Sequence, residues 1–360
     1  MEGAVILENG QTFYGKLFGS LTPSPVAEVV FNTGMVGYQE VMTDPSYKGQ
    51  MVVMTYPLMG NYGLNSEDME SIMPQVSGFI VKEACKIPSN WRLQENLERF
   101  LARHNITGIT GIDTRKLTRV LRERGTMKGM IVPLVAGEVA PVYREILEAS
   151  PLLDNPVARV TTKQSYTIPG SGKRVVVMDF GIKKSILDQL KAFDLELIVV
   201  PSFTGAKDIL ALNPDGLFLS NGPGDPKVVK GGINTVKVLL DKLPVFGICL
   251  GQQVLALALG GETYKLKFGH RGINHPVKDL RDNRVYITSQ NHGYAVRKDT
   301  LPDDTYVTHV NLNDGTVEGF AHKCLPVMAV QFHPEASPGP EDSRYLFQKF
   351  FDSLNKGPLA

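Results

Sequence analysis

The pattern of apolar and polar positions differs between the two parts of the chain. In residues 1–150, short apolar segments separated by turn residues predict strands, for example at 28–32. Two amphipathic segments, 93–103 and 114–124, predict helices. Strands mixed with a few helices indicate an α+β or mixed α/β domain.

From residue 174 onward, apolar strands alternate with helical segments. Strands are expected at 174–178, 195–200, 216–219 and 245–248, and helices at 183–193 and 233–243. Such alternation favours an α/β domain with a doubly wound, mostly parallel sheet. Residues 151–173 are rich in Pro, Gly, Ser and Thr and show little periodicity, which predicts a linker. The expected organisation is therefore a first domain at 1–150, a linker at 151–173 and a second domain at 174–360.

Composition narrows the functional classes. The 38 basic and 37 acidic residues give a net charge of +1, which provides no electrostatic case for a nucleic acid or an anionic membrane as partner. No apolar run approaches the ~20 residues of a membrane span, and no signal peptide is visible. Three widely spaced cysteines do not make a disulfide framework. These features fit a cytoplasmic protein with reduced thiols.

One cysteine has the setting of a nucleophile. Cys249 follows an apolar strand, precedes a helical run and lies between Gly247 and Gly251. This strand–turn–helix layout is that of a nucleophile elbow, which exposes the side chain near a helix N-terminus. The helix dipole there favours the thiolate. Taken alone, a cysteine is more often an inert buried thiol.

A candidate base and its partner come near the C-terminus. His333 and Glu335 follow an apolar segment at 327–332. Residues i and i+2 of an extended segment project to one side, and Pro334 favours extended angles at His333. The carboxylate can then orient the imidazole, which can take a proton from the thiol. By itself, the tripeptide is equally consistent with a surface histidine at a strand end.

A glycine-rich loop supplies candidate oxyanion donors. Residues 220–226 follow the strand at 216–219, and Pro223 has no N–H, so the candidates in the loop are the backbone N–H groups of Gly222, Gly224 and Asp225. Leu250, just after the cysteine, can supply another. All three elements fall at ends of predicted strands, where open α/β sheets hold their sites.

In this order, the three elements resemble the triad-type glutamine amidotransferase domain. Motifs elsewhere make the resemblance more specific, to the small, glutamine-hydrolysing subunit of carbamoyl-phosphate synthase, over nearly the whole chain. They are found at 31–38, 43–47, 111–115, 268–276 and 291–294.

The resemblance implies that Cys249, His333 and Glu335 form a catalytic triad acting on L-glutamine. It also implies a set of glutamine contacts: Ser46, Gly222, Gly224, Leu250, Gln253, Asn291, Gly293 and Tyr294. Because Ser46 belongs to the first domain, the glutamine site is expected at the domain interface. Two positions depart from the family pattern, since Gln252 is often His there and Tyr294 is often Phe.

The resemblance further implies a large synthetase subunit as partner. That subunit receives the ammonia and uses bicarbonate, ATP and metal ions, so no cofactor is expected on this chain. His270 and His275 lack a cysteine or clustered carboxylates beside them, and no metal site is expected. Three alternatives remain open: the glutaminase of another synthase, a non-catalytic glutamine-binding regulator, and a free cysteine hydrolase. The consuming pathway, arginine or pyrimidine, is also open.

Overall fold

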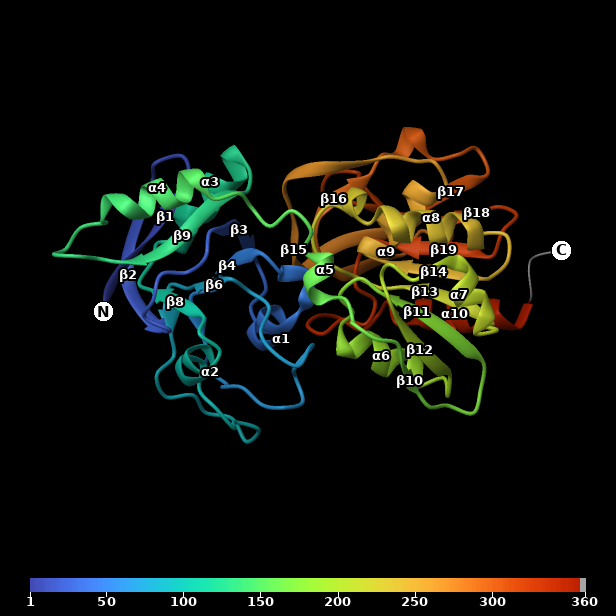
Figure 1. Cartoon of the computed structure of the whole chain (residues 1–360), viewed down its shortest axis with the longest axis horizontal. Helices are drawn as coiled ribbons and strands as arrows, with labels where there is room; N and C mark the ends of the chain where they lie inside the picture. The colour runs from blue at the N-terminus through green and yellow to red at the C-terminus, as the bar shows by residue number, and fades with distance from the viewer. Residues whose placement is uncertain (357–360) are drawn as a thin grey trace. The chain divides into compact units, whose positions relative to one another are not determined.

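The computed structural model describes residues 1–356, which form two compact units, Met1–Asp154 and a second unit that begins at Asn155 (Figure 1). The second domain predicted over 174–360 therefore ends in residues, 357–360, that lie outside the described part. None of the helices within residues 1–356 is long and apolar enough to cross a membrane.

The first unit is built around a closed barrel. Its strands follow the order β1-β2-β8-β6-β4-β3-β9, parallel from β3 through β8 and antiparallel elsewhere. Their bounds are β1 Glu2–Leu7, β2 Thr12–Gly19, β3 Ala27–Asn32, β4 Gln50–Met54, β6 Gly78–Ile80, β8 Thr107–Thr110 and β9 Met127–Pro133. The sequence predicted mixed strands and helices here. The pairing of distant strands that closes the barrel could not be read from local periodicity.

Four helices accompany the barrel: α1 (Tyr38–Thr43), α2 (Leu97–Arg103), α3 (Thr114–Arg124) and α4 (Pro141–Ala149). Helix α3 has the predicted bounds, because Asp113 caps its start and Gly125 follows its end. Helix α2 begins at Leu97 rather than the expected 93, since the Asn96 side chain accepts a hydrogen bond from the N–H of Arg99 and fixes the N-cap.

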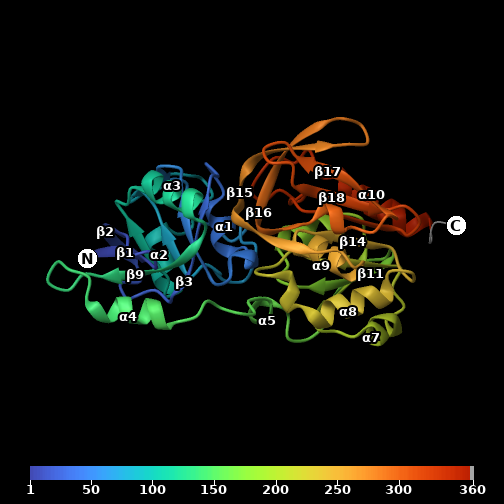
Figure 2. The ribbon, with the colours of Figure 1, turned by 90° about the horizontal axis from the view of Figure 1, so that it is seen from above.

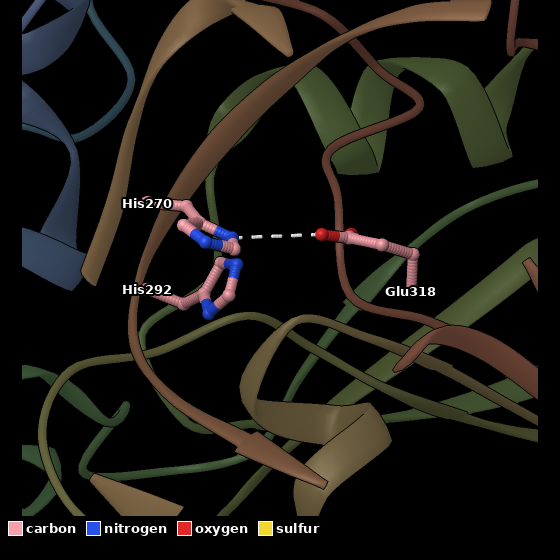
Figure 3. Close-up of side chains that lie close together, drawn as sticks. All are labelled: His270, His292 and Glu318. Atoms are coloured by element: carbon pink, nitrogen blue, oxygen red, sulfur yellow. Dashed lines mark ion pairs between the residues drawn. The ribbon is translucent and has the colours of Figure 1, made fainter. Parts of the chain in front are cut away.

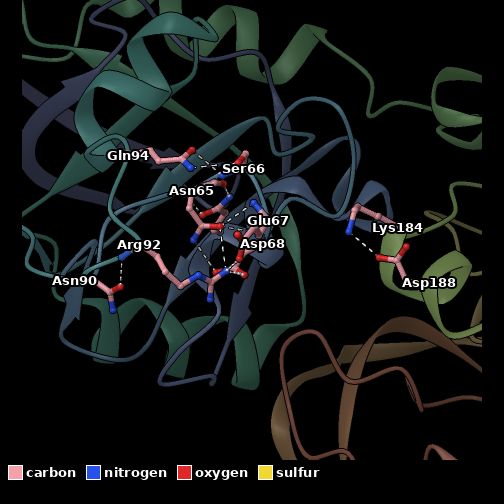
Figure 4. Close-up of polar contacts among 10 residues, drawn as sticks. Asn65, Ser66, Glu67, Asp68, Asn90, Arg92, Gln94, Lys184 and Asp188 are labelled. Atoms are coloured by element: carbon pink, nitrogen blue, oxygen red, sulfur yellow. Dashed lines mark hydrogen bonds and ion pairs between the residues drawn. The ribbon is translucent and has the colours of Figure 1, made fainter. Parts of the chain in front are cut away.

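The segment between β5 (Leu58–Met59) and α2 contains the barrel strand β6 and the short strand β7 (Glu83–Ala84), which pairs with β5. Polar side chains hold the segment together (Figure 4). The Arg92 guanidinium binds the Asp68 carboxylate and lies 3.1 Å from that of Glu67. The Ser66 N–H donates to Oε1 of Gln94, and Nε2 of Gln94 donates to the Ser66 hydroxyl. These contacts order a segment that has little regular secondary structure.

The second unit contains a ten-stranded sheet in the order β10-β12-β11-β13-β14-β19-β18-β17-β15-β16. Its five consecutive strands from β12 to β19 are parallel, and the other pairings are antiparallel. The bounds are β10 Tyr166–Ile168, β11 Arg174–Asp179, β12 Glu196–Pro201, β13 Gly216–Leu219, β14 Val245–Ile248, β15 Thr263–Asp279, β16 Val285–Val296, β17 Thr305–Asn311, β18 Val317–His322 and β19 Val327–Val330.

Helices cover both faces of the parallel strands. Alternate residues of β11 show this: Val175 and Val177 pack in one core with α6 (Lys184–Lys191) and α10 (Tyr345–Lys356). Val176 and Met178 pack in the other core, with α7 (Ala206–Ala211), α8 (Lys230–Leu239) and α9 (Leu250–Ala258). Figure 2 shows α7 and α8 together on one side of the sheet and α10 on the other. Burial on both faces explains why these strands read as continuous apolar runs. The prediction of an α/β fold is confirmed.

Part of the segment expected as a linker, residues 151–173, is regular structure. It contains the short helix α5 (Val157–Val160) and β10, which pairs antiparallel with β12 at the edge of the sheet. Both belong to the second unit, which begins at Asn155. The sequence pattern did not indicate β10, because this strand is three residues long and mostly exposed. Short edge strands carry little hydrophobic signal.

Candidate active site

Two neighbouring parallel strands deliver the candidate nucleophile and base. Strands β14 and β19 pair in register, with Ile248 opposite Val330. Cys249 follows β14 directly, and its N–H donates to the Val330 carbonyl at 2.9 Å. His333 comes three residues after the end of β19, and its N–H donates to the Ser289 carbonyl. Both residues therefore emerge at the carboxyl edge of the sheet, as expected for an α/β site.

Cys249 occupies a strained turn between strand and helix. Its φ of 54° and ψ of −106° lie outside the regions that side-chain-bearing residues prefer. Such a conformation costs about 1–3 kcal/mol and is typical of functional sites. The flanking glycines permit the turn: a Cβ at Gly247 would lie 2.7 Å from backbone atoms of Gly251, and one at Gly251 would overlap the Leu219 carbonyl. The predicted elbow is thus present, with Cys249 at the N-cap of α9.

His333, Glu335 and a lysine form a buried chain of charges. Nδ1 of His333 lies 2.6 Å from Oε1 of Glu335, and the side chains are 2% and 0% exposed. Because a carboxylate only accepts, Nδ1 carries a proton and Nε2 is left for the thiol. Nε2 is buried and has no hydrogen-bond partner among the described residues. The Nζ of Lys183 lies 2.8 Å from the same Glu335 oxygen and also donates to the Ala336 carbonyl.

The surroundings shift the pKa values of both His333 and Glu335. Burial by itself would lower the pKa of His333, but the Glu335 carboxylate and the nearby Cys249 sulfur more than offset it and raise that pKa. Burial disfavours the charged form of Glu335, yet Lys183 and His333 hold its pKa well below the usual value. The carboxylate therefore stays ionised and the imidazole is a stronger base than usual, which suits proton transfer from a thiol.

Lys183 was not among the residues predicted from the sequence. It precedes α6, at the turn that follows β11, and is 3% exposed. A buried lysine needs a partner, and here the partner is Glu335. The available signal was its position: like Cys249 and His333, it follows a strand of the parallel sheet.

The predicted oxyanion loop follows β13. Gly224 has a φ of +85°, a left-handed conformation that favours glycine. A Cβ at Gly222 would overlap the Phe180 carbonyl, so this position also requires glycine. Leu250, the further candidate donor, is the first residue of α9 and is buried.

The other expected contacts lie on β16 and on the neighbouring helix α9. The thiol of Cys249 lies 3.6 Å from the Asn291 carbonyl oxygen. The side-chain amide of Gln253 donates to the Tyr294 carbonyl and to Oε1 of Gln331, each at 2.9 Å. Both donors of Gln253 are therefore engaged within the protein. Gly293 lies between Asn291 and Tyr294 on β16.

Ser46 belongs to the first unit. It lies in a short 3-10 helix, Pro45–Tyr47, and its N–H donates to the Asp44 side chain at 2.8 Å. It is buried. The expected contact of Ser46 with glutamine stays a prediction.

Comparison with protein families defines the class of the second unit. Residues 176–353 match the family model "Glutamine amidotransferase class-I". Residues 5–131 match "Carbamoyl-phosphate synthase small chain, CPSase domain".

Curated relatives cover nearly the whole chain. The carbamoyl phosphate synthase small chain of Clostridium perfringens is 55% identical over 97% of this chain and 99% of its own length. The pyrimidine-specific small chain of Halalkalibacterium halodurans is 53% identical, and the small chain of Bacillus caldolyticus is 54% identical, each over 97% of this chain and 96% of its own length. The chain therefore belongs to the carbamoyl-phosphate synthase small-chain family, and the predicted resemblance is confirmed.

Proposed function

We propose that this chain hydrolyses L-glutamine at Cys249 and delivers the ammonia to a large synthetase subunit that makes carbamoyl phosphate. Membership of the family supports the reaction and the partner. The observation that carries the assignment of residues is the buried His333–Glu335 pair beside the thiol at the end of β14. A glutaminase serving another synthase is not favoured, because the match to the small-chain family includes the first unit.

In the first half of the reaction, Nε2 of His333 accepts the thiol proton and the sulfur of Cys249 attacks the side-chain amide carbon of glutamine. The resulting oxyanion is stabilised by backbone N–H groups near Gly224 and Leu250. When the C–N bond breaks, the imidazolium gives its proton to the departing nitrogen. Ammonia leaves, and a γ-glutamyl thioester remains on Cys249.

In the second half, His333 deprotonates a water molecule that attacks the thioester carbonyl. The C–S bond breaks, glutamate leaves and the thiol is restored. Glu335 keeps the proton on Nδ1 of His333 throughout, so the same nitrogen, Nε2, serves both steps. Lys183 keeps Glu335 ionised. The other glutamine contacts in this mechanism are Ser46, Gly222, Gln253, Asn291, Gly293 and Tyr294.

The remaining assignments follow from this function. ATP and metal ions act on the large subunit, and the barrel unit provides a docking surface for it. The sheet of the second unit belongs to the doubly wound class, since its parallel strands have helices on both faces. The protein works in the cytoplasm, where its thiol stays reduced. The name of the relative from Halalkalibacterium halodurans favours pyrimidine synthesis as the consuming pathway.

The Cys249→Ser variant tests the function in the complex with the large subunit. Glutamine-dependent synthesis of carbamoyl phosphate should be abolished, because a serine hydroxyl is far less acidic than a thiol. Ammonia-dependent synthesis should persist, since that substrate bypasses the thioester. Retained use of glutamine would exclude Cys249 as the nucleophile. Loss of both activities in an intact complex would contradict the separation of the two steps.

A further inference from the structure

Two imidazoles and a carboxylate meet inside the second unit, and one of them is next to the expected glutamine contacts of β16. They are His270 on β15, His292 on β16 and Glu318 on β18, all buried (Figure 3). One nitrogen from each ring and one carboxylate oxygen lie within 4.8 Å of one another. The two histidines are direct cross-strand neighbours. The sequence pattern pairs His270 with His275. It does not reveal the cluster, because His292 meets His270 through the register of the β15–β16 hairpin and Glu318 comes from β18.

One ring nitrogen of His292 has a lone pair that no hydrogen-bond donor uses. Nδ1 lies 2.7 Å from the Tyr294 carbonyl oxygen. A carbonyl only accepts, so Nδ1 carries the proton and Nε2 of the neutral ring carries none. Nε2 is buried and has no hydrogen-bond partner in the described part of the chain. A buried acceptor of this kind has lost its hydrogen bond to water and has gained none within the protein, which costs free energy.

His270 is oriented in a similar way by a different partner. Its Nε2 lies 2.8 Å from Oδ2 of Asp314, which favours a proton on that nitrogen. Its Nδ1 has no hydrogen bond and faces Oε1 of Glu318 at 3.6 Å. A proton on Nδ1 would satisfy His270 but would leave Nε2 of His292 without a partner. A cation between the three groups satisfies all of them.

Glu318 is held as an oriented carboxylate. Its Oε2 accepts from the Gln290 side chain at 2.8 Å, and its Oε1 accepts from the Asn311 side chain at 2.9 Å. Each oxygen keeps a further lone pair. Metal-binding histidines characteristically donate their second ring N–H to a carbonyl or carboxylate, and ligating carboxylates are themselves hydrogen-bonded. All three side chains of this cluster follow that pattern.

We infer that Nδ1 of His270, Nε2 of His292 and the Glu318 carboxylate bind a divalent transition-metal ion, with Zn²⁺ the ion best matched to two imidazoles and a carboxylate. Zinc–nitrogen bonds of about 2.0–2.1 Å place tetrahedral ligand atoms about 3.4 Å apart, so the 3.6 Å between His270 and Glu318 is already close. A water molecule provides the fourth ligand of the ion.

The ion has a positioning role for the active site. It joins β15, β16 and β18, and its ligand His292 lies within the segment from Asn291 to Tyr294. The carbonyl of Asn291 lies 3.6 Å from the Cys249 sulfur, and that of Tyr294 accepts from Gln253. Fixing His292 therefore fixes the backbone on which both contacts depend. The inference itself does not rest on the proposed glutaminase function.

Metal binding is best measured in the full chain carrying Cys249→Ala, which removes the catalytic thiol as a competing ligand. After treatment with a chelator and dialysis, titration with Zn²⁺ or Co²⁺ should reveal one ion per chain. Adding His292→Asn or Glu318→Gln should weaken binding more than about a hundredfold, because even partners of ligands typically contribute ten- to a hundredfold. His275→Asn is the matched control, since its ring lies beside that of His270 but outside the cluster, and binding should be retained.

Absence of stoichiometric binding in the Cys249→Ala protein would overturn the inference. So would unchanged affinity after His292→Asn and Glu318→Gln. A spectrum of the Co²⁺-loaded wild-type protein decides the question without these substitutions, in case they prevent folding. Bands of a nitrogen- and oxygen-ligated ion without thiolate-to-metal charge transfer support the site, whereas a strong charge-transfer band from a single bound ion places it at a cysteine and contradicts the site.

Discussion

The Nζ of Lys183 lies 2.8 Å from Oε1 of Glu335, and both side chains are almost completely buried. The same oxygen lies 2.6 Å from Nδ1 of His333. One carboxylate oxygen thus contacts both the Lys183 Nζ and the imidazole that serves the thiol. This arrangement makes Lys183 a positioning residue that acts through Glu335.

Replacing Lys183 by methionine should therefore damage both stability and activity. Removing one partner of a buried ion pair typically costs about 3–5 kcal/mol, because the other charge is left uncompensated. The pKa of Glu335 should rise and the orientation of His333 should loosen, lowering kcat for glutamine hydrolysis. Urea unfolding and steady-state kinetics measure the two effects.

Lys184→Met provides the control for that experiment. The neighbouring Lys184 pairs with Asp188 at 2.7 Å, but both side chains are about half exposed (Figure 4). Exposed pairs contribute about 0–1 kcal/mol. Similar losses of stability in the two variants would contradict a special role for the buried pair.

The Glu335→Gln variant should change how stability depends on pH. In the folded wild-type protein the pKa of His333 is raised, whereas in the unfolded chain it returns to about 6.5. When Cys249→Ser is present in both proteins, no thiol can supply this proton. Above that pH the folded state then holds a proton that the unfolded state has lost, so stability with Glu335 present should fall as pH rises, by up to about 1.4 kcal/mol per pH unit. The variant lacks the carboxylate that holds this proton, so the fall should be shallower. Unfolding curves at pH 7, 8 and 9 compare the two slopes. Equal slopes would mean that Glu335 does not control the protonation of His333.

A glutamine-shaped electrophile should modify Cys249 in preference to the other thiols. Cys249 is buried, Cys85 is partly exposed and Cys324 is exposed. A small unselective alkylating reagent should follow exposure and react first at Cys324. A chloroketone analogue of glutamine should instead follow recognition and nucleophile activation. Mass spectrometry of peptides locates each adduct, and excess glutamine should protect only Cys249. Labelling of Cys324 by the analogue at an equal rate would contradict a glutamine site at Cys249.

Gly251→Ala should disrupt the elbow. The added methyl group would overlap the Leu219 carbonyl, and forcing extra atoms into a packed site typically costs about 1–3 kcal/mol. Glutaminase activity should fall further than stability, because the displaced backbone carries Cys249 and Leu250. Gly231→Ala in α8 is the control, since a Cβ there meets nothing within 4 Å. That change should be neutral or slightly stabilising, so parallel losses in both variants would contradict the steric argument.

Sequence patterns predicted what depends on local order. The elbow at Cys249 needs only a strand, two glycines and a helix in succession, and all are visible in the sequence. The proximity of His333 and Glu335 follows from a two-residue spacing. In contrast, the pairing of Lys183 with Glu335 and the meeting of His270, His292 and Glu318 depend on strand order. That order is set by which buried faces pack together, and a single sequence does not encode it in any short window. Closure of the barrel in the first unit is hidden for the same reason.

Strand β19 is the last strand within residues 1–356, yet it lies inside the sheet, between β14 and β18. During synthesis, the place beside the cysteine-bearing strand stays unfilled until residues 327–330 have emerged. The same short segment then seals the middle of the sheet and carries the base to the sulfur. A chain that ends before residue 327 therefore lacks both the strand that completes the sheet and the base that serves the thiol.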